Sequence, residues 1–189
     1  MGDLVARAVS IAGHPALLMP VAAAIASPAQ IRPVAIAMSL ACACAVLGYS
    51  FYKARRGEWL HIDASVPGER AQLNVRVGVG LLATAGGLWL AGVHVGLPLV
   101  ICLSGLIVAA GHLLKGIAKL SLHVAFAVFA AFVVWPNHVA AVTLALVAAG
   151  VAWSRLALQR HVAADIILGA LSGAAAGLVF HISVARLAT

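Results

Sequence analysis

The chain has 189 residues, of which 64% are hydrophobic and only 9% are charged, and its mean hydropathy is +1.10. These values lie far above those of soluble domains, so they exclude a soluble enzyme or binding protein. The net charge of +7 would suggest a nucleic-acid partner in a soluble protein, but here the basic residues lie in short loops between apolar segments. We therefore expect membrane lipids with anionic headgroups as partners, and no nucleic acid.

Apolar segments follow one another along the whole chain. A membrane span needs about 20 apolar residues, and the candidate segments are about 9–27, 32–52, 74–92, 97–114, 119–135, 138–154 and 161–184. The first is the weakest, because His14, Pro15 and Pro20 interrupt it, and it could be kinked, re-entrant or interfacial. No linker or repeat divides the chain. The sequence predicts an all-α integral membrane protein, a polytopic helical bundle of six or seven transmembrane helices in a single domain, 1–189.

Polar residues gather in three of the connections between these segments. If every segment crosses the membrane, the loops after the second, fourth and sixth segments emerge on the same face, so we expect the three clusters to converge. The first cluster comprises Asp63, Glu69 and Arg70, the second Lys115, Lys119, Ser121 and His123, and the third Ser154, Arg155, Arg160, His161 and Asp165.

The third cluster carries the most informative pattern. Ser154 and Arg155 are followed by five spacer residues, then His161, three more spacers and Asp165. In a helix that starts near Arg160, His161 and Asp165 stand at i and i+4, so the carboxylate can orient the imidazole and stabilise a charge on it. Arg155 lies on the preceding turn, where its planar guanidinium could hold a phosphate against the ring. The pattern predicts phosphoryl chemistry on a histidine.

This pattern resembles the third signature of the type 2 phosphatidic acid phosphatase superfamily, whose fold vanadium haloperoxidases share. The sequence Leu120-Ser121-Leu122-His123 resembles the second signature, which is normally Pro-Ser-Gly-His, but lacks the Pro and the Gly. The first signature, normally Lys-x6-Arg-Pro, is matched at Arg70, whereas Asp63 stands in place of its lysine and Ala71 in place of its proline. The resemblance covers about residues 53–184.

The resemblance implies a membrane lipid phosphatase that hydrolyses a lipid phosphate or diphosphate through a phosphohistidine intermediate. His161 would be the nucleophile, Asp165 its orienting partner, and His123 the acid that protonates the leaving alcohol and then activates water. Phosphate would be bound by Arg155, Arg70, Ser121, Ser154 and Lys119, the last supplying the missing cation of the first signature. The alternatives are a lipid-linked phosphotransferase with the same intermediate and a catalytically inactive membrane protein of the same fold.

The acidic residues do not form a cluster that could hold magnesium, so we expect catalysis without a metal or other cofactor. They are Asp3, Glu58, Asp63, Glu69 and Asp165. A transporter would need polar residues along a path through the middle of the membrane, and this distribution does not offer one.

The remaining polar and small residues are interpreted as structural. The histidines without ligand-like spacing are read as structural or interfacial: His14, His61, His94, His112, His138 and His181. Small residues are read as sites of close helix packing: Gly86, Gly87, Gly169, Gly173 and Gly177.

The positive charges predict an orientation in a bacterial inner (plasma) membrane. Basic residues in short loops favour the cytoplasm, and the face of the candidate residues carries most of them. Arg32 and Arg186 lie on the other face, against Arg7, Lys53, Arg55, Arg56, Arg70, Arg76, Lys115, Lys119, Arg155 and Arg160. We therefore expect a cytoplasm-facing site, with the C-terminus outside.

Overall fold

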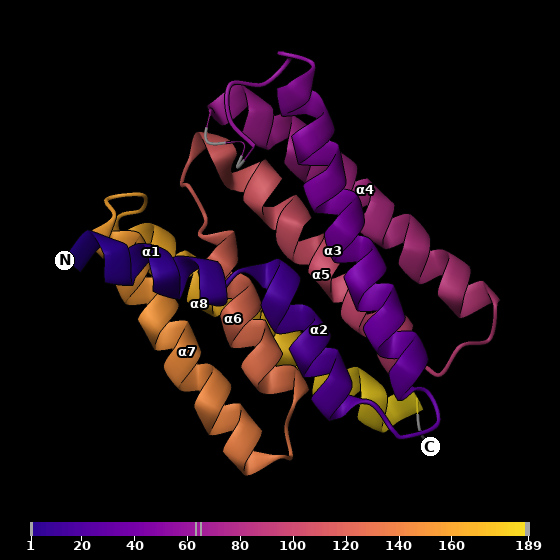
Figure 1. Ribbon diagram of the computed structural model, residues 1–189. Coiled ribbons are helices and arrows are strands. Elements are labelled where there is room, and N and C mark those ends of the chain that lie inside the picture. The colour runs from indigo at the N-terminus through magenta and orange to yellow at the C-terminus, as the bar shows by residue number, and fades with distance from the viewer. Residues whose placement is uncertain (1, 63, 65, 188–189) are drawn as a thin grey trace.

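The computed structural model describes residues 2–62, 64 and 66–187, and these residues form a bundle of helices without strands (Figure 1). The helices are α1 (Gly2–Ala12), α2 (Pro15–Ala26), α3 (Arg32–Arg55), α4 (Pro67–Leu90), α5 (Gly96–Leu113), the short 3-10 helix η1 (Leu114–Gly116), α6 (Leu122–Val133), α7 (His138–Ala157) and α8 (Ala163–Leu187). The predicted all-α membrane bundle is confirmed. Within the described chain, α3, α4, α5 with η1, α7 and α8 are long and apolar enough to cross a membrane.

The first predicted span, 9–27, is formed by two helices. α1 and α2 meet at a bend of 47°, and only if they count together do they give a sixth candidate span. Pro15 opens α2, where its missing N–H breaks no helical hydrogen bond and its fixed φ suits the first turn. The expectation of a kink in this segment is confirmed.

α6 differs most from the sequence prediction, because it has only 12 residues where a span over 119–135 was expected. It starts late, since Ser121 is extended and donates its backbone N–H to the carbonyl of Asp165 at 3.1 Å. It ends three residues before Pro136, which disfavours helix in the residue that precedes it. Most of its residues are buried, and it packs against α2, α5, α7 and α8. A helix enclosed by other helices does not need to match the thickness of a bilayer, so the predicted span over 119–135 is not found among the described residues.

A row of glycines lets α8 approach α6 closely. A Cβ at Gly169 would lie 2.6 Å from the carbonyl oxygen of Ser121, and one at Gly173 would lie 2.2 Å from that of Ala125. Gly177 faces the side chain of Phe132 in the same way. The predicted packing role of these three is confirmed. The same prediction is wrong for Gly86 and Gly87, where a Cβ would meet nothing within 4 Å.

The connections that carry the polar clusters lie at one end of the bundle. In Figure 1 the loop after α3, the segment between α5 and α6 and the turn between α7 and α8 share that end, while the α2–α3, α4–α5 and α6–α7 turns and the last described residues of α8 lie at the opposite end. Contacts join the second and third clusters, since Lys119 Nζ donates to the carbonyl of Arg160 at 2.9 Å. The predicted convergence therefore holds for the described residues, and Asp63 lies outside them.

The α6–α8 contact provides a test of the fold. We expect Gly173→Ala to destabilise the protein by about 1–3 kcal/mol, because the added methyl group meets the backbone of α6. The control is Gly80→Ala in α4, which meets nothing within 4 Å and should be neutral or slightly stabilising. Thermal unfolding in detergent measures both; equal midpoints for the two variants would contradict this packing.

Candidate active site

His161 lies in the tight turn between α7 and α8, two residues before α8 begins, and not inside the helix as the sequence suggested. Gln159 takes a left-handed conformation (φ 53°), and the N–H groups of Arg160 and His161 both donate to the carbonyl of Arg155. The turn thus folds His161 back over the end of α7. Its side chain is only 8% exposed.

Asp165 stands in the first turn of α8 and joins two segments through its carboxylate. Oδ2 accepts from the ring of His161 at 3.1 Å and from the N–H of Val162 at 3.3 Å. Oδ1 accepts from the N–H of Lys119 at 3.1 Å. The negative charge is also well placed near the N-terminus of a helix. The predicted pairing of His161 with Asp165 is therefore present.

These contacts determine the tautomer of His161. Its Nδ1 lies 3.1 Å from the carboxylate of Asp165 and 3.2 Å from the carbonyl of Lys119. Both partners are acceptors, so Nδ1 carries the hydrogen and, in the neutral ring, Nε2 keeps its lone pair. Burial lowers the pKa of His161, the hydrogen bond to Asp165 partly opposes this, and the charges of Arg155 and Lys119 lower it further. The ring is thus mainly neutral at neutral pH, with one fixed orientation.

Basic side chains surround this ring. Burial lowers the pKa of the Lys119 amine, and the charges of Arg70, Arg155 and Arg160 lower it further, against the opposing effect of Asp165. Because its charge acts on Lys119, Arg70 in the first turn of α4 lies near the residues of the other two clusters. Cations that disfavour one another's charge create a site that favours an anion.

Arg155 occupies the last turn of α7, as the sequence indicated, and it contacts the N-terminal helix. Its Nη1 donates to Ser10 Oγ of α1 at 2.9 Å. Ser10 is buried, with 8% of its surface exposed. The hydroxyl therefore fixes one side of a guanidinium that belongs to the predicted phosphate-binding set.

His123 lies in the first turn of α6, and its neighbours come from three segments. The ring of His14, between α1 and α2, makes an edge-on contact with the ring of His123, with centroids 4.9 Å apart and planes at 85°. Burial lowers the pKa of His123, and the charges of Arg155, His161 and Arg160 lower it further. The predicted nucleophile and the predicted acid are therefore in the same cluster.

The two serines that were predicted to bind phosphate differ in their hydrogen bonds. Ser121 is fully buried, and its Oγ makes no hydrogen bond with the described residues. Ser154 is equally buried, but its Oγ donates to the carbonyl of Val151 in its own helix at 2.8 Å. The geometry does not support the predicted phosphate-binding role of Ser154, because its hydroxyl hydrogen is already used inside α7.

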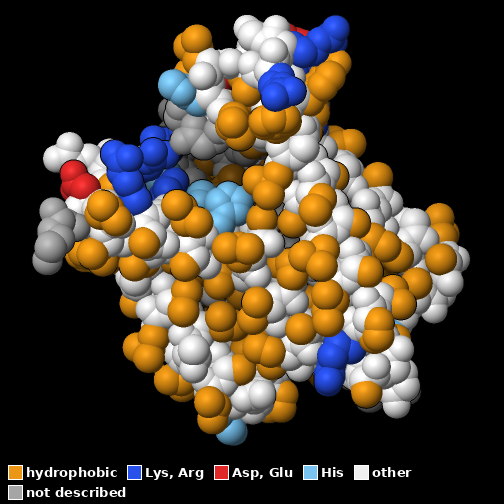
Figure 2. Space-filling view, in the orientation of Figure 1, with side chains coloured by type: hydrophobic (Ala, Val, Ile, Leu, Met, Phe, Trp, Pro, Cys, Tyr) orange, Lys and Arg blue, Asp and Glu red, His pale blue; other side chains and the backbone are white. Residues whose placement is uncertain are grey.

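The cluster lies beside a hollow in the surface. Figure 2 shows blue Lys and Arg side chains next to pale blue His side chains at the edge of this hollow, between the end of α3 and α4 and the helices below it. Most other side chains on that face are hydrophobic. The polar groups are therefore concentrated where an anion could approach and apolar surface lies close by.

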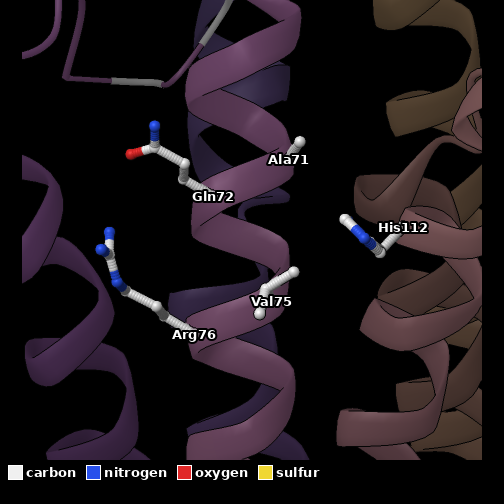
Figure 3. Close-up of a pocket in the computed structure, with 5 residues that line it drawn as sticks. All are labelled: Ala71, Gln72, Val75, Arg76 and His112. Carbon is white, nitrogen blue, oxygen red and sulfur yellow. The ribbon is translucent and has the colours of Figure 1, made fainter.

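A separate pocket of about 290 Å³ lies between α4 and α5. In Figure 3 the ring of His112 points from α5 toward Ala71 and Val75, while Gln72 and Arg76 point to another side of α4. Arg76 is engaged there with the ring and hydroxyl of Tyr49 from α3. None of the predicted site residues lines this pocket, so it is not the candidate active site.

Sequence reasoning missed Ser10 and His14. Ser10 gives no signal by itself, because serine is common in apolar helices. His14 did give one, since an ionisable residue inside an apolar segment is costly and often functional. It was interpreted as structural or interfacial because nothing in the sequence places residue 14 beside residue 123.

Among the described residues, no group of three or more His, Cys, Asp or Glu side chains is arranged to hold a metal ion. No protein-family model, curated protein or solved structure matches this chain.

The tautomer of His161 can be observed directly. We expect ¹⁵N spectra of histidine-labelled protein in detergent to show His161 mainly as the neutral Nδ1–H form at pH 7, and less protonated at pH 6.5 than an ordinary histidine, because burial lowers its pKa. The His161→Ala spectrum assigns the signal. An Nε2–H form would contradict the hydrogen-bond pattern, and a mainly protonated ring at pH 7 would contradict the lowered pKa.

Proposed function

We propose that this protein is a membrane lipid phosphatase of the type 2 phosphatidic acid phosphatase kind, which cleaves a lipid phosphate or diphosphate through a phosphohistidine. The observation that carries the proposal is the state of His161. Its Nδ1 is held by Asp165 and by the carbonyl of Lys119, which directs the lone pair of the opposite nitrogen, Nε2, away from both. A histidine with one nitrogen anchored and the other nucleophilic is suited to attack phosphorus.

The surrounding groups fit a phosphoryl substrate. Arg155 offers a planar set of donors, and Arg70 and Lys119 add positive charge within the same cluster. The buried Oγ of Ser121 has no partner among the described residues, and a phosphate oxygen would supply one. Buried polar groups are normally satisfied, so such a hydroxyl suits a ligand contact. Together these donors could stabilise the charge of a five-coordinate phosphorus.

The reaction has two steps. In the first, Nε2 of His161 forms a bond to phosphorus, the bond from phosphorus to the lipid oxygen breaks, and His123 gives that oxygen its proton. Burial and the charge of Arg155 lower the pKa of His123 to about 2, so the ring is neutral in the empty site and takes this proton from the singly protonated phosphate of the substrate. In the second, His123 takes a proton from water, the hydroxide attacks phosphorus, and the phosphorus–nitrogen bond breaks to release phosphate. Asp165 stabilises the positive charge that the phosphorylated ring carries. No metal or cofactor takes part in either step.

A lipid is the expected substrate because of where these groups lie. They occur at helix ends at one end of the bundle, the level at which a headgroup phosphate sits. Exposed apolar side chains of α1, including Leu4, Val5 and Ile11, lie on the helix that contacts Arg155 through Ser10. The phosphate could enter the cationic cluster while the acyl or prenyl chains stay among the apolar helices.

The test is release of phosphate by purified protein from phosphatidate, phosphatidylglycerophosphate and an isoprenyl diphosphate, with a chelator present throughout. We expect His161→Ala to lower the rate by more than about 1,000-fold, because no other group replaces the nucleophile. Asp165→Asn should lower it severely while the protein stays folded. His123→Ala should accumulate a phosphoenzyme from p-nitrophenyl phosphate, because this leaving group needs no proton while hydrolysis of the intermediate still needs His123.

The matched control is His138→Ala, at the opposite end of the bundle, where the ring contacts Trp135. It should keep wild-type turnover. A folded His161→Ala protein that releases phosphate at the control's rate would refute the mechanism, and complete dependence on added magnesium would refute metal-independent hydrolysis.

We also propose that the site faces the cytoplasm. The basic residues of short loops lie at the end of the bundle that holds the site, and such residues favour the inside. A reporter that is active only outside the cytoplasm, fused after Thr189, should be active. A reporter silent there, together with labelling from outside of a cysteine placed at Arg56, would reverse the orientation.

A further inference from the structure

The α1–α2 corner, Gly13 and His14, is held firmly against α7. A Cβ at Gly13 would lie 2.0 Å from Cγ2 of Val151, so only a glycine allows this approach. The N–H of Gly13 donates to the carbonyl of Val9, and the carbonyl of His14 accepts from the N–H groups of Leu17 and Leu18. The corner is thus a defined structure, and the position of the His14 side chain follows from it.

The ring of His14 is fixed at both edges. Its Nδ1 accepts the N–H of Ala16 at 3.1 Å, so the neutral ring carries its hydrogen on Nε2. Protonation at Nδ1 would break this hydrogen bond and place a second positive charge near Arg155, whose own charge opposes it. His14 is therefore held as a neutral imidazole, packed edge-on against His123 at 4.9 Å.

We propose that His14 is a positioning residue for His123. This inference rests on the proposed function, in which His123 protonates the leaving oxygen and then activates water. A side chain with rotatable bonds delivers a proton efficiently only when its ring is held in place. The edge-on contact limits the orientation of the His123 ring, and the neutral state of His14 avoids a charge that would disfavour a proton on His123.

The corner acts on the phosphate-binding side as well. Ser10, one helical turn before His14, accepts the hydrogen bond from Arg155 at 2.9 Å. One short segment thus contacts both the guanidinium that would bind the phosphate and the ring that would protonate the leaving group. The N-terminal segment completes the site, although it lies far from the three polar clusters in the sequence.

The test uses His14→Asn, because an asparagine oxygen can still accept the N–H at the start of α2 while the ring is lost. The matched control is His94→Asn. The Nδ1 of His94 accepts the N–H of Gly96 in the same arrangement, but this side chain is exposed and lies at the opposite end of the bundle.

The readout is the rate of the first step with two leaving groups. A lipid alcohol needs a proton as it departs, whereas p-nitrophenolate leaves without one. We expect His14→Asn to slow phosphoenzyme formation from a lipid phosphate by about 10-fold or more, and the p-nitrophenol burst from p-nitrophenyl phosphate by less than about threefold. His94→Asn should match the wild type with both substrates.

A double-mutant cycle separates positioning from general stability. If His14 acts through His123, then His14→Asn should add less than about a twofold loss in a His123→Ala background. Two results would overturn the proposal in favour of a structural role. One is an equal loss of rate with the two substrates, and the other is a double variant whose loss of rate is the product of the two single losses.

A second measurement does not depend on activity. In ¹⁵N histidine spectra, His14→Asn should shift the His123 resonances, while His94→Asn should leave them unchanged. Unshifted His123 resonances would overturn the ring contact itself, even in an active enzyme. A wild-type protein that releases no phosphate from any substrate would refute the proposed function, and the positioning role with it, whether or not the spectra show the contact.

Discussion

The carboxylate of Asp165 is the interaction on which the rest of the site depends. It accepts hydrogen bonds from the backbone of Lys119 and Val162 and from the ring of His161. The backbone carbonyl of Asp165 accepts the N–H of Ser121. With the bond from Lys119, the start of α8 is thus joined twice to the segment that leads into α6. A buried carboxylate is stable only when such partners replace water. The same contacts that satisfy the charge also orient the ring of His161 and position the start of α6.

Close packing of α8 on α6 makes these hydrogen bonds possible. Gly169 stands one helical turn after Asp165 and faces the carbonyl of Ser121, and Gly173 faces that of Ala125 one turn further on. Larger residues at these positions would hold the two backbones apart and lengthen the bonds between residues 119–121 and Asp165. Side-chain volume inside the bundle thus controls geometry at its end. This is a strict constraint, because the contacts are with backbone atoms, which cannot move aside as a flexible side chain can.

The cationic groups of the site raise the opposite problem. Arg70, Lys119, Arg155 and Arg160 lie near enough to disfavour protonation of one another or of the histidines. Such an arrangement costs free energy in the empty protein and is relieved when an anion binds. Ser10 and the carbonyl of Arg160 fix Arg155 and Lys119 by hydrogen bonds. These donors are therefore already ordered, which would reduce the loss of side-chain entropy if the proposed phosphate binds there.

Composition and spacing by themselves determined much of this protein. Backbone polar groups in a bilayer must be paired internally, and continuous apolar segments of about 20 residues achieve this as helices. Hence the helical bundle, the break near Pro15 and the separation of polar loops onto one end followed from the sequence. The pair His161 and Asp165 also followed from the spacing, although His161 lies in the turn before α8 and bonds to a carboxylate in the first turn of that helix.

Tertiary structure decided what depends on contacts between distant segments. The length of α6 could not be read from its apolar sequence, since enclosure by other helices removes the need to span a bilayer. The roles of Ser121 and Ser154 look alike in the sequence, yet only the fold shows that Ser154 donates within its own helix. Ser10 and His14 reach Arg155 and His123 through the bend between α1 and α2 and the packing of Gly13 on α7. Such contacts join residues more than a hundred positions apart, and no local pattern encodes them because they arise from how the helices pack.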